Sequence, residues 1–124
     1  MIDTILEPHG EVDPEEIQEN IRQCICLELL VAFLEKDKPL TKPMHTGWIF
    51  AQFMDAVIQM IRDDLTAMRE DLQANGAEIL SVTQDTLGRS VKFVVGGQVY
   101  EQRYLNESIR VECDELLRMI LGLK

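Results

Sequence analysis

The spacing of apolar residues changes near Ala77, and this change limits the fold more than any other feature of the sequence. Before it, apolar residues recur every three or four positions, the period of a helix buried on one side. After it they alternate with polar residues, the period of a half-buried strand. The helical spacing returns after Asn106. The pattern predicts two helices, then a set of strands, then one more helix.

The first two helices have recognisable ends. The stretch EVDPEEI offers an N-cap Asp followed by Pro, so a helix is predicted from Pro14 to about Lys36. The loop KDKPLTKPMH ends it, because two prolines interrupt the pattern. A second helix is predicted from near Thr46 to the Asn75-Gly76 pair, where a left-handed C-cap is favoured. Its expected apolar stripe consists of Phe50, Phe53, Met54, Val57, Ile61, Leu65, Met68 and Leu72.

That second helix is unusually long for a chain of this size. At 1.5 Å per residue it extends over about 40 Å. We therefore expect it either to project from the domain or to form part of a dimer seam.

Three short strands are predicted in EILSVTQ, SVKFVV and QVYEQRYL. The two glycines between the second and third strands favour a two-residue hairpin turn, which places Phe93 opposite Tyr100. Closing the earlier turn over DTLG places Leu80 opposite Phe93, and Val82 opposite Val91. Both pairings join apolar side chains, as cross-strand neighbours of a half-buried meander should.

The last helix is predicted from Asn106, acting as its cap, to about Leu121. The expected fold class is α+β, in the order α-α-β-β-β-α, with a three-stranded antiparallel meander and the helices packed on one face. Residues 1–12 are expected to form an acidic N-terminal arm, and residues 13–124 a single domain.

The stretch CICLELLVAFL, residues 24–34, has one polar residue, Glu28, among eleven. A helix that is apolar all round is buried all round. One side of this helix would ordinarily face water in so small a domain. We therefore expect a second chain to cover that side and predict a homodimer.

Three interpretations of Glu28 remain open from the sequence. Its carboxylate could reach solvent at the edge of the interface. It could instead form a buried pair that fixes the interface register, with Arg22, Arg62 or His45 as its partner. The third interpretation is a catalytic acid or base, although no second candidate catalytic residue stands at a spacing that would pair it with Glu28.

The net charge of the chain limits the classes of partner that it can bind. The formal net charge is −10, and the first twenty residues contain seven acids and no Lys or Arg. Direct binding to nucleic acid or to an anionic membrane surface is therefore not expected. The opening stretch lacks a basic, apolar export signal, and no segment approaches the roughly 20 apolar residues of a membrane span. We expect a soluble cytoplasmic protein whose three cysteines are reduced.

No catalytic, cofactor-binding or metal-binding residues are assigned from the sequence. Cys24 and Cys26 point to opposite sides of a helix, so they cannot share a metal ion. A zinc site using His9, His45 and Cys113 would need the fold to bring them together. No phosphate-binding loop is found either.

The expected function is therefore non-catalytic: binding another protein as an adaptor, chaperone-like or regulatory factor, as a homodimer. One alternative is an acidic inhibitor that mimics nucleic acid. Another is a small-ligand-binding domain or enzyme whose pocket lies at the subunit interface. The candidate interaction residues are Leu27, Glu28, Leu30 and Leu34 on the first helix, the acids Glu11, Asp13, Glu15, Glu16 and Glu19, and the apolar spot Ile79, Val94 and Val99.

Overall fold

The computed structural model describes residues 14–123 and confirms the α+β fold. The predicted acidic arm, residues 1–12, lies outside the described residues. Within them, the order is two helices, three strands and one helix, with a short 3-10 helix in the first connection. The bounds are α1 Pro14–Asp37, η2 Lys38–Thr41, α2 Gly47–Ala74, β1 Ala77–Gln84, β2 Gly88–Val95, β3 Gln98–Leu105 and α3 Asn106–Ile120.

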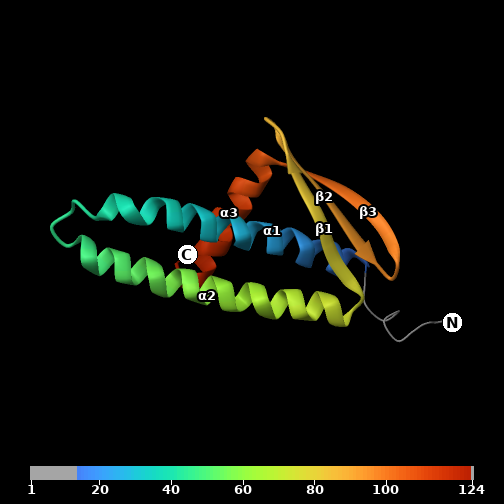
Figure 1. The fold of residues 1–124 in the computed structure, drawn as a ribbon, viewed down its shortest axis with the longest axis horizontal. Coiled ribbons are helices and arrows are strands. Elements are labelled where there is room, and N and C mark those ends of the chain that lie inside the picture. Colours follow the sequence, from blue (N-terminus) through green and yellow to red (C-terminus); the bar gives the residue numbers. More distant parts are fainter. Residues whose placement is uncertain (1–13, 124) are drawn as a thin grey trace.

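The helices α1 and α2 form a long antiparallel hairpin; the sheet lies at one end of it, and α3 runs from the sheet toward the middle of the hairpin (Figure 1). The sheet packs beside the first half of α1 and the end of α2, and α3 crosses α1. The loop between α1 and α2 projects from the opposite end. The long second helix therefore projects, as one of the two expectations for it stated. Within residues 14–123, no helix is long and apolar enough to cross a membrane.

The sheet is antiparallel in the order β1-β2-β3. Its second hairpin has the predicted register, with Phe93 opposite Tyr100 and Lys92 opposite Glu101. The two aromatic rings are stacked, with their centroids 5.7 Å apart. The glycine pair between the strands adopts the left-handed backbone that this turn requires.

The first hairpin corrects one predicted pairing. Val82 lies opposite Val91 as predicted, but Ile79, and not Leu80, lies opposite Phe93. Leu80 is the extra residue of a β-bulge, which shifts the alternation of faces by one position. Ile79 consequently packs against the core.

The predicted apolar spot of Ile79, Val94 and Val99 is therefore wrong. Val94 does lie opposite Val99, but on the face of the sheet that points away from Phe93 and the core. Because of the bulge, Ile79 lies on the core face, opposite to the face of Val94 and Val99. The alternation of apolar residues alone could not reveal the bulge, because a bulge leaves both flanking segments with the same period.

The middle of the first helix is buried by its own chain. Cys24, Ile25, Cys26, Leu27 and Leu30 are at most 4% exposed. The core cluster joins them to apolar residues of α2, of β2 and of α3, so three neighbours surround the middle of α1. For these residues the expectation that a second chain must cover the helix was wrong, and Leu27 and Leu30 are core residues rather than surface candidates. Later in the same stretch, Ala32 and Phe33 are exposed, as that expectation required. The homodimer remains a prediction, without this premise.

The start of α3 also differs from expectation. Asn106 is the first residue of the helix rather than its cap. Its backbone N–H donates to the carbonyl oxygen of Leu87 at 2.9 Å, and its side-chain amide donates to that of Thr86 at 3.2 Å. These bonds tie α3 to the loop between β1 and β2, and so set the distance between α3 and the end of the first hairpin.

Candidate functional site

Glu28 forms an ion pair with Arg69 of α2. The side chains are 39% and 51% exposed, so the pair lies at the surface of the hairpin. None of the three partners considered from the sequence is the one observed. Glu28 thus reaches solvent, as the first interpretation expected, and is not part of a buried pair. Its contact joins two helices of one chain.

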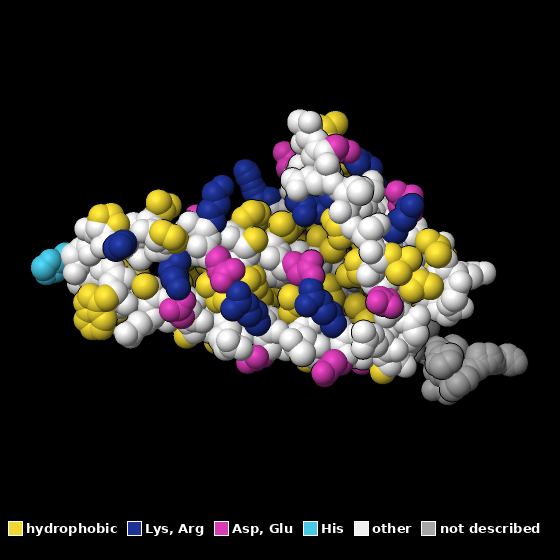
Figure 2. Space-filling model, viewed as in Figure 1, with side chains coloured by type: hydrophobic (Ala, Val, Ile, Leu, Met, Phe, Trp, Pro, Cys, Tyr) yellow, Lys and Arg dark blue, Asp and Glu magenta, His cyan; other side chains and the backbone are white. Residues whose placement is uncertain are grey.

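Two further ion pairs accompany it. Arg62 binds Glu35 with an N–O distance of 2.8 Å, and Lys38 binds Asp55 at 2.6 Å. The three α2 residues, at positions 55, 62 and 69, are each seven apart and therefore lie along one side of that helix. Figure 2 shows opposite charges side by side along the junction of the two helices. We call this row the ion-pair ladder; it joins α2 to α1 and, through Lys38, to η2.

The acidic run at the start of α1 is partly neutralised within the chain. Glu11 and Asp13 lie outside the described residues, whereas Glu15, Glu16 and Glu19 are exposed. Hydrogen bonding from Arg22 lowers the pKa of Glu19. Arg22 also lies 3.1 Å from a carboxylate oxygen of Glu112 on α3. The run therefore carries less free negative charge than the sequence suggests.

A second apolar stripe runs along the outer side of α2, and the sequence analysis missed it. Ile49, Phe53, Ala56 and Met60 are all exposed, and they are spaced by four, three and four residues. We call these four residues the α2 stripe. Phe53 was predicted to be in the core. It lies about 40° around the helix from the buried Val57 and about 80° from Ile61, at the edge of the buried side, and it is exposed.

The end of the hairpin exposes further large apolar side chains. Leu40 is 71% exposed and Trp48 64%, and Met44 is about half exposed. Figure 2 shows hydrophobic side chains at this end, beside the histidine. We call Leu40, Met44 and Trp48 the hairpin tip. Phe50, also predicted to be in the core, is exposed near it.

A groove of about 660 Å³ lies between α1, α3 and the end of the first hairpin. One end of it is polar, with Gln84, Arg89, Asn106 and Arg110. Asp37, Asp114 and Phe33 also line it. We call it the α1–α3 groove. Leu34, predicted as an interaction residue, is part of its apolar floor, which consists of Leu29, Leu30, Leu34, Ile109, Cys113 and Leu117.

The three cysteines are free and buried in the core. Burial raises the pKa of Cys24 to about 11. The thiol of Cys113 donates to the backbone carbonyl oxygen of Cys26 at 3.6 Å. In the part of the chain that the structure describes, no group of three or more His, Cys, Asp or Glu residues could hold a metal ion.

The zinc site considered from the sequence is not brought together among these residues. His45 lies in the exposed loop between α1 and α2, whereas Cys113 is buried on α3. His9 lies outside the described residues.

A comparison with known families places the chain. Residues 12–124 match the family model described as YhjD protein. The chain belongs to the YhjD family. The match spans the hairpin, the sheet and α3, so the α2 stripe, the hairpin tip and the α1–α3 groove all lie within the YhjD region. No curated protein and no solved structure matches this YhjD chain.

Proposed function

We propose that this YhjD-family chain is a non-catalytic interaction protein that works as a homodimer, with two copies paired through the α2 stripe. The observation that carries the proposal is the exposed apolar stripe on the outer side of α2. It borders the side of the helix that faces the core and stays exposed beside it. Apolar side chains with this spacing are the ones that interdigitate when two helices pack together.

An antiparallel pairing of two α2 helices suits the shapes of these residues. When Phe53 of one copy lies opposite Ala56 of the other, Ile49 falls opposite Met60 by the same count. Each contact then joins a larger with a smaller or more flexible side chain, which favours close packing. The polar residues Gln52 and Gln59 would flank the seam.

Charge favours the same arrangement. The second half of α2 carries four acids, Asp63, Asp64, Glu70 and Asp71, and its two arginines are already paired with α1. The loop before α2 carries Lys42 and His45. Antiparallel pairing brings the loop of one copy alongside the acidic half of the other, and parallel pairing would place acid beside acid. Such complementarity selects orientation more than it adds affinity.

The hairpin tip would remain outside this seam and could receive another protein. Trp48 precedes Ile49 by one residue and so points about 100° away from the stripe. Large aromatic side chains of this kind dominate many binding interfaces. The nucleic-acid-mimic alternative has less support, because Arg22 already binds Glu19 and Glu112.

Sedimentation equilibrium at micromolar concentration tests the dimer. We expect a particle of about 28 kDa, twice the 14.2 kDa of one chain. Phe53→Glu should yield a folded monomer, because it places a charge in the seam. Val111→Glu, at an exposed apolar position of α3, and Trp48→Glu should both leave the dimer intact. A wild-type particle of 14.2 kDa, or a Phe53→Glu variant that still dimerises, would contradict the proposal.

A further inference from the structure

The α1–α3 groove contains two arginines that form no ion pair with the described part of the chain. Among residues 14–123, the guanidinium groups of Arg89 and Arg110 form no hydrogen bond or ion pair. The other five arginines all have partners: Arg22, Arg62, Arg69 and Arg103 bind carboxylates, and Arg118 is also engaged. In a chain of net charge −10, two unpaired arginines in one groove are an exception that calls for a ligand.

Arg89 supports this most directly. Its Nε is buried, yet it has no acceptor within the described residues. A buried donor without an acceptor costs free energy, so such a group usually has a partner. Arg89 begins β2 opposite Gln84, whose side chain lies on the same face of the sheet and also lines the groove.

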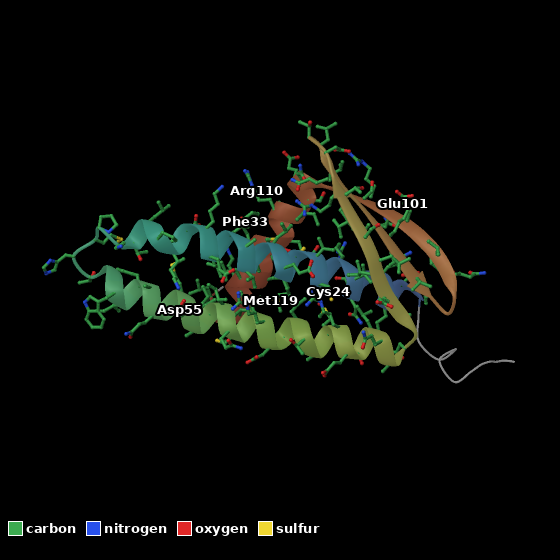
Figure 3. All side chains as sticks on the ribbon, viewed as in Figure 1. Cys24, Phe33, Asp55, Glu101, Arg110 and Met119 are labelled. Carbon is green, nitrogen blue, oxygen red and sulfur yellow. The ribbon has the colours of Figure 1, made fainter. Side chains whose placement is uncertain are left out.

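Arg110 approaches the groove from the other side. It lies one turn after Asn106 on α3, and the bonds of Asn106 to the β1–β2 loop hold that end of the helix beside the hairpin. Figure 3 shows Arg110 and Phe33 near each other where α3 crosses α1. The two arginines and the Gln84 amide therefore form a donor-rich end above an apolar floor.

The rest of the groove defines the ligand. Its volume of about 660 Å³ is in the usual range for small-molecule sites, and its floor is apolar. Asp37 and Asp114 also line it, so a ligand with several negative charges, such as a nucleotide, would meet repulsion. A single carboxylate suits the fork of an arginine and carries only one charge.

We propose that the α1–α3 groove binds a long-chain carboxylic acid, with its carboxylate between Arg89 and Arg110 and its hydrocarbon chain along the apolar floor. The site belongs to one chain and does not depend on the dimer. The acid is proposed as a free, soluble ligand, and a membrane surface is an alternative that the test separates.

Isothermal titration with dodecanoate, kept below its micelle concentration, tests the site on the full chain. We expect saturable binding of one dodecanoate per chain. Arg89→Gln and Arg110→Gln should each weaken it about 10-fold or more, because each variant loses a charge-assisted hydrogen bond to the carboxylate. Arg89→Lys should give an intermediate loss, because it keeps the charge but not the fork. Circular dichroism checks that each variant is folded.

The control variant is Arg62→Gln, which removes the same charge from the ion-pair ladder and should leave dodecanoate binding unchanged. Phe53→Glu should also bind normally, so failure of the dimer and failure of the groove remain distinguishable. Absence of saturable binding, equal binding of the neutral dodecanol, or unchanged affinity in the Arg89→Gln, Arg110→Gln double variant would overturn the proposal. So would binding only to anionic phosphatidylglycerol vesicles.

Discussion

Arg69 of α2 binds Glu28 of α1, one heptad after Arg62 of the same helix binds Glu35. Glu28, the single polar residue of its apolar stretch, therefore belongs to a set of ion pairs that repeats every seven residues. Each pair is half exposed and therefore only weakly stabilising. Together the pairs favour one axial position of α2 against α1, because a shift along the helix would break all of them.

The Glu28–Arg69 pair should show a small coupling energy. In a double-mutant cycle with Glu28→Gln and Arg69→Gln, we expect a coupling of about 0.2–1 kcal/mol in the free energy of unfolding. The measurement is urea unfolding of the four proteins. A coupling above about 3 kcal/mol would mean that the pair behaves as a buried one.

Truncation of Val57 tests the core between the two long helices. Val57 is 4% exposed, so Val57→Ala should lower the free energy of unfolding by about 1.5–3 kcal/mol through lost burial and a new cavity. Val111 on α3 is 57% exposed, and Val111→Ala should change the free energy of unfolding by less than about 0.5 kcal/mol. Similar losses in the two variants, measured by urea unfolding, would contradict this packing.

Gly88 should not tolerate a side chain. A Cβ at this position would clash with the backbone carbonyl oxygen of Tyr104 on the neighbouring strand, so Gly88→Ala should cost about 1–3 kcal/mol. Gly96→Asn provides the control. The φ angle of Gly96, 57°, is one that asparagine adopts in this turn. A Cβ at this position would meet no atom within 4 Å beyond its chain neighbours. Equal melting temperatures for the two variants would contradict the strand spacing.

Asp85 should make stability depend on pH in the acid range. Arg103 and the backbone N–H groups of Leu87 and Gly88 hold the pKa of Asp85 below its ordinary value of 3.8. A pKa lower in the folded state gives stability that is present above pH 3.8 and lost as the pH falls through the folded pKa. Asp85→Asn should therefore lower the melting temperature at neutral pH.

The difference in melting temperature between the wild-type protein and Asp85→Asn tests this prediction. The difference should shrink as the pH falls, because protonated Asp85 and asparagine are then both uncharged. Melting curves of both proteins across the acid range measure it. A difference that stays constant at all pH values would show that the carboxylate charge has no role in the loop.

Several features could be predicted from the sequence because they depend on residues close together in the chain. The two-glycine turn set the pairing of Phe93 with Tyr100, and the last strand has the predicted limits, Gln98 and Leu105. The first helix begins at the predicted Pro14 and ends at Asp37, one residue after the predicted Lys36. Apolar period and turn chemistry are local, so they fix element type and order without knowledge of the partner surfaces.

The tertiary structure decided the rest. Burial of Leu27 and Leu30 depends on the arrangement of α2, the sheet and α3 around α1, and the partner of Glu28 lies 41 residues away. Arg89 and Arg110 come close because Leu105, the last residue before α3, pairs with Gly88, the residue before Arg89, and the packing of α3 beside α1 then closes the groove. The sequence by itself determined which elements form and in what order. Only the packing of distant elements determined which faces are covered, because burial and pairing are properties of neighbours in space.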